Sequence, residues 1–280
     1  MREPGASGEA EMMNEQAGWE PSSEVSLLTR DGIGLRARWL AAEQKPRAVV
    51  VVAHGFSAHS EEASVQALAT RLLAEGLDVL VYDARGHGRS DGHSGVGSTE
   101  RLDVAAAVDE ALFRKLPVIL VGVSMGAVAV AKYLGDLPDR EWICGAVLVS
   151  APACWRMRPS LMGLLTAGMT RTLPGRWIAS RWLRVRISKG WRVGEPLVDV
   201  IKRVDLPVAI VHGTSDRLLS ERQARLLRTS HNGPTRYDAV VGMRHGLDGL
   251  GQTAVMSAVD WVLETQEAVV AEEPAVAVAL

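Results

Sequence analysis

Short apolar runs alternate with longer amphipathic segments along most of the chain. Ala48–Ala53 and Val118–Val121 are continuous and rich in valine, as expected for strands buried on both faces of a sheet. After Ser60, apolar residues recur every three or four positions as far as Gly76, which predicts a helix with Ser60 as its N-cap. The same two patterns predict further strands at Leu77–Tyr82, Ala146–Ser150, Val208–Val211 and Tyr237–Val241, and helices from about Thr99, at Met125–Leu134, Arg222–Leu227 and Thr253–Thr265.

The first two strands are connected differently from the rest. Val25–Thr29 and Gly34–Trp39 flank Asp31-Gly32, a pair typical of tight turns between antiparallel strands. A hairpin followed by strand–helix repeats predicts an α/β fold with a mostly parallel sheet, an N-terminal antiparallel hairpin and helices on both faces. In such sheets ligands bind at the carboxyl ends of the strands.

One segment interrupts the alternation. Residues 153–205 lie between two predicted strands and contain two or three predicted helices, so we interpret them as a small helical cap insertion. The acidic start of the chain and its end, rich in Ala, Val and Glu, predict disordered tails. The predicted organisation is therefore a tail at 1–22, a catalytic domain at 23–152 and 206–266, the cap at 153–205 and a tail at 267–280.

Composition narrows the partners and the compartment. The net charge of the 280 residues is −2, so no overall positive field favours nucleic acid. Cys144 and Cys154 are separated by a predicted strand of roughly 30 Å, so we expect free thiols and a reducing, cytoplasmic location. The sequence has no zinc-type Cys/His spacing, no apolar run long enough to span a membrane and no secretory signal. We expect neither a metal nor a cofactor.

A glycine-rich turn carries a candidate nucleophile. Gly122-Val123-Ser124-Met125-Gly126 follows a predicted buried strand and begins a predicted helix. A serine on so sharp a turn needs small neighbours, and the helix behind it directs its first amides toward a developing negative charge. The motif by itself is equally typical of a helix-capping turn, so the residues farther along the chain decide between the two interpretations.

The loop after Ala48–Ala53 is a candidate oxyanion hole. His54-Gly55-Phe56 follows this strand directly, and Gly55 allows the backbone to approach a substrate closely. A tetrahedral intermediate needs two backbone amide donors, for which we expect the amides of Phe56 and Met125. The His54 side chain is expected to brace the loop.

Two more strands end in residues that suit a catalytic base and its acid. Asp216 follows Val208–Val211, and His245 follows Tyr237–Val241, so both should lie at the same sheet edge as Ser124. Asp205 precedes its strand and belongs at the opposite edge, and Asp248 follows His245 too closely to orient it. We therefore predict Ser124 as nucleophile, His245 as base and Asp216 as acid.

With these residues the chain resembles the α/β-hydrolase superfamily and, within it, the monoacylglycerol-lipase-like small serine esterases. The residues that carry the resemblance are His54-Gly55-Phe56, Asp83-Ala84-Arg85-Gly86-His87-Gly88-Arg89-Ser90-Asp91-Gly92, Gly122–Gly126, Gly213-Thr214-Ser215-Asp216-Arg217-Leu218 and His245. Their order of Ser, Asp and His is that of this superfamily. The resemblance implies a serine hydrolase that cleaves a small-molecule acyl or lipid-like ester through an acyl-enzyme, with Asp83–Gly92 as a structural loop.

Other functions fit the same residues. A thioesterase, an acyltransferase, a peptidase and a carbon–carbon hydrolase use the same triad, and a binding module without turnover can retain it. A nucleophilic serine argues against the dehalogenases and epoxide hydrolases of the superfamily, because these use a carboxylate.

The predicted cap is strongly basic. Residues 153–205 contain eleven Lys or Arg against three Asp or Glu, a net charge of +8, and four of the eight Trp. On a helix through Arg176–Arg186, Ile178, Trp182 and Val185 share one face. This face either packs on the catalytic domain as a pocket roof or gives a weak peripheral contact with a membrane.

Overall fold

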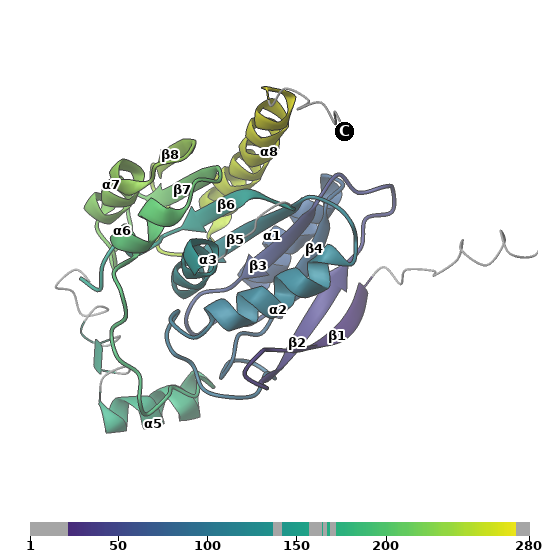
Figure 1. The fold of residues 1–280 in the computed structure, drawn as a ribbon. Coiled ribbons are helices and arrows are strands. Elements are labelled where there is room, and N and C mark those ends of the chain that lie inside the picture. Colours follow the sequence, from purple (N-terminus) through teal and green to yellow (C-terminus); the bar gives the residue numbers. More distant parts are fainter. Residues whose placement is uncertain (1–21, 137–141, 157–163, 165–166, 169–171, 273–280) are drawn as a thin grey trace, which may run out of the picture.

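The computed structural model describes residues 22–136, 142–156, 164, 167–168 and 172–272 (Figure 1). Its centre is an eight-stranded sheet with the order β1-β2-β4-β3-β5-β6-β7-β8. β1 pairs antiparallel with β2 and β2 antiparallel with β4, whereas every other neighbouring pair is parallel. The strands are β1 (Ser22–Leu28), β2 (Gly34–Leu40), β3 (Val49–Ala53), β4 (Asp78–Tyr82), β5 (Val118–Val123), β6 (Ile143–Val149), β7 (Val208–Gly213) and β8 (Thr235–Val240). The predicted fold class is confirmed.

Helices cover both faces of this sheet (Figure 1). Alternate residues of β3 show why its valine run is continuous. Val49 and Val51 pack in a cluster with α2 and α3, while Val50 and Val52 pack on the other face with α1 and α8. The helices are α1 (Ala63–Ala74), α2 (Arg101–Leu112), α3 (Met125–Asp136), α5 (Leu173–Trp182), α6 (Leu197–Val200), α7 (Glu221–Ser230) and α8 (Gly249–Glu272), with a 3-10 helix η1 at Ile201–Arg203.

The start of α1 differs from the prediction. The helix begins at Ala63 with Glu62 as its N-cap, and no side chain caps it. Ser60 is not the cap, because its backbone amide donates to Asp83 Oδ1 at 2.7 Å and so holds it in the preceding turn. The predicted inward face is present: Val65, Leu68, Ala69 and Leu72 are buried.

Two predicted boundaries also need correction. Ser22 is the first residue of β1, and α8 continues through residues 267–272, where Ala, Val and Glu without Gly or Pro suit a helix. The rest of the predicted tails, residues 1–21 and 273–280, lies outside the described residues. Leu197, Val200, Ile201 and Val204, assigned to the cap, are buried in the main core beside α3 at helical spacing.

Helix α5 buries a different face from the one predicted. Its buried residues are Gly175 and Ala179, whereas Ile178 is 44% and Trp182 78% exposed. Ala179 packs in an apolar cluster with Val96, Val185 and Ile187, whereas the larger apolar side chains of the helix are exposed. Val185, predicted on the same helix face, lies beyond the end of the helix at Trp182 and is buried.

The described part of the chain has no disulfide bond, no cluster of metal ligands and no membrane-spanning helix. Cys144 is buried and Cys154 half-buried, and both are free thiols, as predicted. In these residues no group of three or more His, Cys, Asp or Glu is arranged to hold a metal ion. None of the described helices is long and apolar enough to cross a membrane.

Candidate active site

Ser124 stands on a strained turn between β5 and α3. Its φ is 51°, in the left-handed region that non-glycine residues seldom adopt. A Cβ on Gly122 would lie 2.7 Å from the Cα of Ala127, and one on Gly126 would collide with the carbonyl oxygens of Ala53 and His54. The two glycines therefore allow the first turn of α3 to sit tightly against the strand ends, with Ser124 at the sheet edge.

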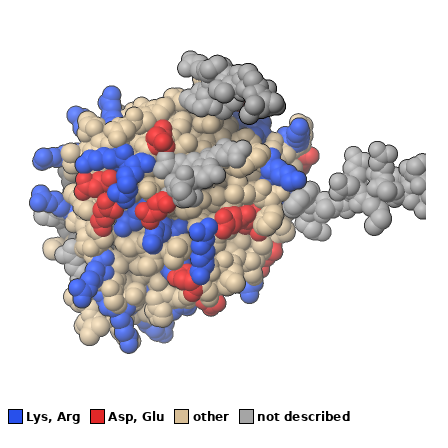
Figure 2. All heavy atoms as spheres, viewed as in Figure 1, with Lys and Arg blue, Asp and Glu red and all other residues tan. Residues whose placement is uncertain are grey.

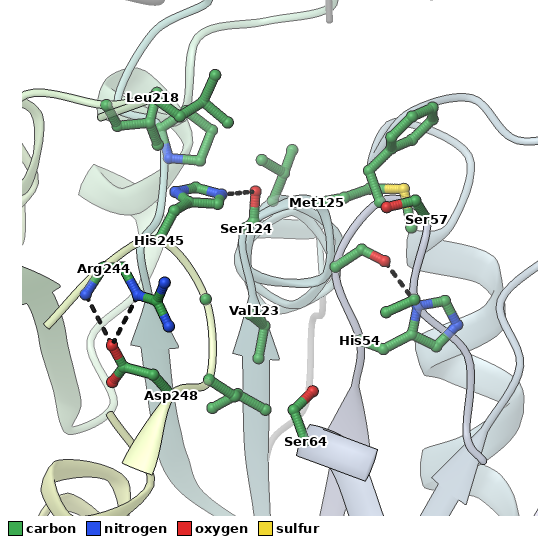
Figure 3. Close-up of a pocket in the computed structure, with 18 of the residues that line it drawn as sticks. His54, Ser57, Ser64, Val123, Ser124, Met125, Leu218, Arg244, His245 and Asp248 are labelled. Carbon is green, nitrogen blue, oxygen red and sulfur yellow. Dashed lines mark hydrogen bonds and ion pairs between the residues drawn. The ribbon is translucent and has the colours of Figure 1, made fainter. Parts of the chain in front are cut away.

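The three residues predicted to act together lie in one hydrogen-bonded row, and Figure 3 shows the contact between Ser124 and His245. His245 Nε2 is 3.0 Å from Ser124 Oγ, and His245 Nδ1 is 2.7 Å from Asp216 Oδ2. Ser124 follows β5, Asp216 follows β7, and His245 lies in the loop between β8 and α8. Since β5, β7 and β8 are parallel, their carboxyl ends bring the three side chains to one edge of the sheet.

The carboxylate of Asp216 is buried but well supplied with donors. Its Oδ1 accepts the amides of Leu218 at 2.7 Å and Leu219 at 2.9 Å, which leaves Oδ2 for His245. Burial acts to raise the pKa of Asp216, but the hydrogen bond and charge of His245 and the two amides outweigh it and hold the pKa below its ordinary value. Asp216 is thus an ionised, fixed acceptor for the His245 ring.

The rejected carboxylates have other positions. Asp248 accepts the amides of Arg244 and Gly251, both at 2.9 Å, and so fixes the turn into α8 (Figure 3). Asp205 precedes β7 and lies at the opposite end of that strand. Asp216 is the carboxylate in contact with His245.

The amides of Phe56 and Met125 are available to a ligand. Within the described residues, neither amide donates a hydrogen bond to the protein. Met125 is the first residue of α3, where backbone N–H groups have no partner inside the helix. Phe56 lies in the loop after β3, beside the turn that carries Ser124: a Cβ on Gly55 would be 3.4 Å from the Val123 carbonyl oxygen.

His54 braces this loop. The amide of Ala84 donates to His54 Nε2 at 2.9 Å, so the ring proton is on Nδ1, which lies 2.8 Å from the Gly55 carbonyl oxygen. Burial lowers the pKa of His54, which keeps the ring neutral as this pattern requires. The side chain connects the loop after β3 to the one after β4.

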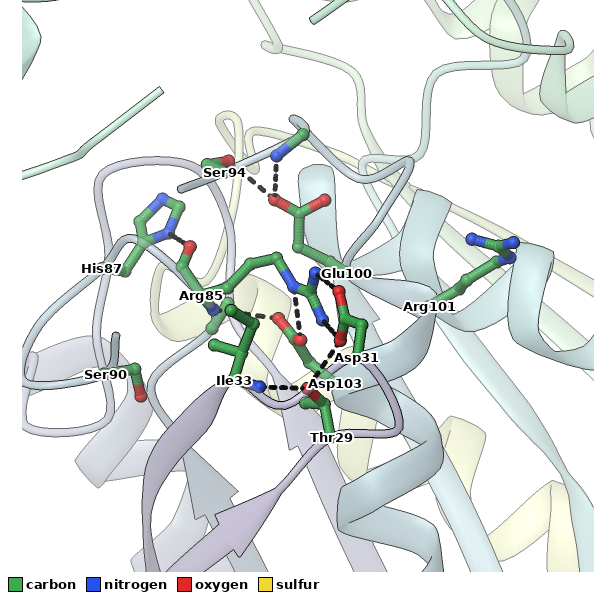
Figure 4. A network of polar contacts seen from close by, with 12 residues as sticks. Thr29, Asp31, Ile33, Arg85, His87, Ser90, Ser94, Glu100, Arg101 and Asp103 are labelled. Carbon is green, nitrogen blue, oxygen red and sulfur yellow. Dashed lines mark hydrogen bonds and ion pairs between the residues drawn. The ribbon is translucent and has the colours of Figure 1, made fainter. Parts of the chain in front are cut away.

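The Asp83–Gly92 loop is held by buried charges (Figure 4). Arg85 lies between Asp103, whose Oδ1 is 2.7 Å from Nε, and Asp31, whose Oδ2 is 2.7 Å from Nη1. His87 packs edge-on against the rings of His54 and Phe56, and burial lowers its pKa to about 3. Their contacts are with the turn between β1 and β2, the loop after β3 and helix α2, in keeping with a structural loop.

A cavity of about 1310 Å³ opens above Ser124. Sequence reasoning missed most of its apolar lining, because these residues come from loops far apart in the chain. The only local signal is the pair of glycines on either side of Val96. The apolar residues concerned include Val65, Val96, Val128, Trp155, Leu183 and Leu218.

The surface charge is mixed on one face of the molecule and also among the residues that line the cavity. Figure 2 shows acidic and basic side chains interspersed on the face seen in Figure 1, with no continuous basic area on that face. At the cavity rim, Arg217 and Arg244 are accompanied by Glu62 and Asp248. The cavity rim therefore has no excess of either charge.

Comparison with known proteins gives one family and several relatives. The model of a family described as serine aminopeptidase, S33, matches residues 44–195. A monoglyceride lipase of Homo sapiens is 34% identical over 131 residues, which are 44% of this chain and 41% of that protein. A monoacylglycerol lipase of Mycolicibacterium smegmatis is 29% identical over 257 residues, covering 73% of this chain and 83% of the relative. The matched part thus spans less than half of the human relative's length.

Solved structures share the fold. An esterase of Pyrococcus furiosus superposes with a TM-score of 0.62 at 21% identity, over 89% of this chain and 94% of that one. Est1E of Butyrivibrio proteoclasticus, solved with ferulic acid, gives a TM-score of 0.63 at 20% identity, over 87% and 99% of the two chains. At such identities the likeness concerns the fold.

Proposed function

Because the chain belongs to the serine aminopeptidase, S33, family and has the α/β-hydrolase fold, we propose that it is a serine hydrolase that cleaves a carboxylic ester. Ser124 is the nucleophile, His245 the general base and Asp216 the acid that orients the base. The observation that carries the proposal is the row of hydrogen bonds from Ser124 Oγ through His245 to Asp216, which starts from a strained turn.

The proposed reaction has two half-reactions. Ser124 Oγ attacks the acyl carbon while its proton passes to His245 Nε2, and the carbonyl electrons move to the oxygen, which the amides of Phe56 and Met125 stabilise. When this tetrahedral intermediate collapses, the alcohol leaves with the proton from His245. A water molecule, activated by the same ring, then releases the acid from Ser124. Asp216 holds the His245 tautomer and stabilises the imidazolium in both halves.

The proposed substrate is a small acyl or lipid-like ester. The apolar residues of the cavity support an apolar substrate portion. The names of the lipase relatives and of the esterases with this fold support the ester bond. Thioesters, amides and carbon–carbon bonds are the alternatives for this triad, and the family description points to peptides among them. A panel of matched ester, thioester and amide substrates distinguishes these bonds.

The nucleophile is tested without knowledge of the substrate. A fluorophosphonate probe should label the wild-type protein covalently, and Ser124→Ala should abolish labelling and ester turnover with the fold unchanged by circular dichroism. Cys154→Ala, which changes another cavity residue, is the control and should still be labelled. Labelling that persists in Ser124→Ala would overturn the assignment.

We also propose a weak peripheral contact between α5 and anionic membranes. Four large apolar side chains of this helix, Leu173, Trp177, Ile178 and Trp182, are exposed, and Arg181 and Arg184 are exposed beside them. A helix with exposed aromatic and basic residues suits a membrane interface.

A further inference from the structure

Val96 has an unfavourable backbone conformation at the wall of the cavity. Its φ is 50°, in the left-handed region, where a β-branched side chain is a genuine outlier. It is only 4% exposed, and it lines the cavity above Ser124. Such strain persists only where the surroundings enforce it, and it gathers at functional sites.

The enforcing group is the carboxylate of Glu100 (Figure 4). Its Oε1 accepts the amide of Gly95 at 2.8 Å and the hydroxyl of Ser94 at 2.6 Å, while Oε2 accepts the amide of Gly97 at 2.8 Å. The Val96 amide donates to Ser94 Oγ at 3.0 Å. Glu100 is buried, so it holds the amides on both sides of Val96 without competition from water.

This loop lies directly against the nucleophile helix. A Cβ on Gly97 would be 2.8 Å from Val128 Cβ and 3.0 Å from the Met125 carbonyl oxygen, so only a glycine allows this approach. On its other side, Val96 packs in an apolar cluster with Val185 and Ile187. Val96 therefore fills the space between the first turn of α3 and the chain segment after α5.

We propose that Val96 is a specificity-determining residue that limits the size of the acyl portion of the substrate, and that Glu100 positions it. This inference rests on the proposed ester hydrolysis. His245 must reach the oxygen of the leaving alcohol, so the alcohol lies on the His245 side of Ser124. Met125 lies on the opposite side of Ser124 (Figure 3), and the loop of Val96 packs against it. The Val96 side chain thus faces the space left for the acyl chain.

The test compares Val96→Ala with Val185→Ala. Both changes remove the same atoms from one apolar cluster, but only Val96 lines the cavity. For p-nitrophenyl octanoate against p-nitrophenyl butyrate, Val96→Ala should raise the ratio of the two kcat/KM values by about tenfold, the effect of one or two methyl groups in an apolar pocket. Val185→Ala should leave this ratio within twofold of wild type.

An unchanged ratio in Val96→Ala would overturn the proposal, provided that the variant is labelled by the fluorophosphonate like wild type. Absence of labelling in the wild-type protein would instead count against the proposed function itself. Val96→Gly, which accepts a positive φ, provides the same comparison if the alanine variant does not fold.

The positioning role of Glu100 has its own readout. Glu100→Gln replaces one of the two carboxylate oxygens with an NH₂ donor. The glutamine side chain therefore cannot accept hydrogen bonds from the amides of both Gly95 and Gly97. Its octanoate-to-butyrate ratio should rise in the same direction as that of Val96→Ala. Added to Val96→Ala, the change should have little further effect on the ratio, because both act through one side chain. Full additivity of the two effects, or loss of turnover at an unchanged ratio, would contradict this role.

Discussion

Single residues in unfavourable backbone conformations gather around Ser124. Six non-glycine residues of the described chain have a positive φ, and three of them, Ser57, Val96 and Ser124, line the cavity. A fourth, Ser150, accepts the amide of Gly246 beside His245. Strain of this kind is maintained by the surrounding packing, so these residues of the cavity wall are held in fixed backbone conformations.

The acid of the proposed triad is a single-residue prediction. Asp216→Asn should leave the side chain in place but favour the wrong His245 tautomer, and kcat should fall by about 10⁴-fold with a modest change in KM. The amides of Leu218 and Leu219 can still donate to the asparagine oxygen, so the fold should persist. Steady-state kinetics on a soluble p-nitrophenyl ester measure the loss.

Asp248→Asn is the matched control for that variant. Asp248 follows His245 closely in the sequence and lines the cavity, but its oxygens accept the amides of Arg244 and Gly251. Its replacement should lower thermal stability slightly and change kcat by less than about tenfold. If Asp248→Asn is the crippling change and Asp216→Asn is near wild type, the acid has been wrongly assigned.

The buried guanidinium group of Arg85 connects three parts of the chain that are distant in sequence. Asp31 comes from the turn between β1 and β2, Arg85 from the loop after β4, and Asp103 from α2. The β1–β2 hairpin is thereby attached to the Asp83–Gly92 loop and to α2.

The attachment of the hairpin should depend on pH. The hydrogen bond from Arg85 holds the pKa of Asp31 at about 2, below its ordinary value of 3.8. A lowered pKa means that this charge stabilises the fold at pH values above 3.8, and that the contribution is lost as pH falls through about 2. The free energy of unfolding of wild type should exceed that of Asp31→Asn by a constant amount from pH 7 to 5. The gap should narrow from pH 4 to 2. Urea unfolding at each pH measures it, and a constant gap down to pH 2 contradicts the prediction.

The elements that sequence periodicity predicts well are those whose pattern is set by burial. The valine run of β3 and the inward face of α1 reappear in the structure because each strand or helix face buries a fixed set of positions. The predicted N-cap of α1 is wrong, because the Ser60 amide donates a hydrogen bond to Asp83, a residue distant in sequence. The predicted buried face of α5 is wrong, because Ala179 packs with Val96 and Ile187, which are distant in sequence, while Trp182 is exposed.

In the candidate site too, the sequence predicts what the order of the strands determines and misses what contacts between distant residues determine. Ser124, Asp216 and His245 could be placed together because parallel strands bring their carboxyl ends to one edge. The role of Val96 could not be predicted, because its strain depends on Glu100 and its position depends on α3. Contacts between loops leave no periodic trace in the sequence.

On the scale of the whole molecule, the exposed apolar face of α5 suggests a surface experiment. Reversal of Arg181 and Arg184 to Glu should weaken binding to vesicles with a high phosphatidylserine content, at about 1 kcal/mol for each basic residue near the surface. The loss should diminish as salt rises. Turnover of a soluble short-chain ester should change little. Co-sedimentation at low ionic strength measures binding.

The same charge change elsewhere is the control. Arg222 and Arg228 are exposed on α7, and their reversal to Glu alters the net charge equally. This variant should bind vesicles like wild type. If wild type does not sediment with the vesicles, or if both variants lose binding equally, the proposed contact of α5 is wrong.

The chain between Arg156 and Arg186 is attached at one end to α7 and at the other to the Asp83–Gly92 loop. Gln223 of α7 accepts the Cys154 amide at 3.0 Å and donates to the Arg156 carbonyl oxygen. At the other end, Arg186 donates through its backbone to Gly86 at 2.8 Å and through its side chain to Gly92 at 3.1 Å.

Such double attachment has an evolutionary consequence. When the ends of a loop are fixed, each doubling of its length costs only about 0.6 kcal/mol of closure entropy. Insertions and deletions between the two anchors should therefore cost little folding free energy, provided that Gln223 and Arg186 keep their hydrogen bonds and that Ala179 and Val185 stay buried. Related chains can thus differ in this one segment through recombination, while the strands that position Ser124, Asp216 and His245 remain under constant selection.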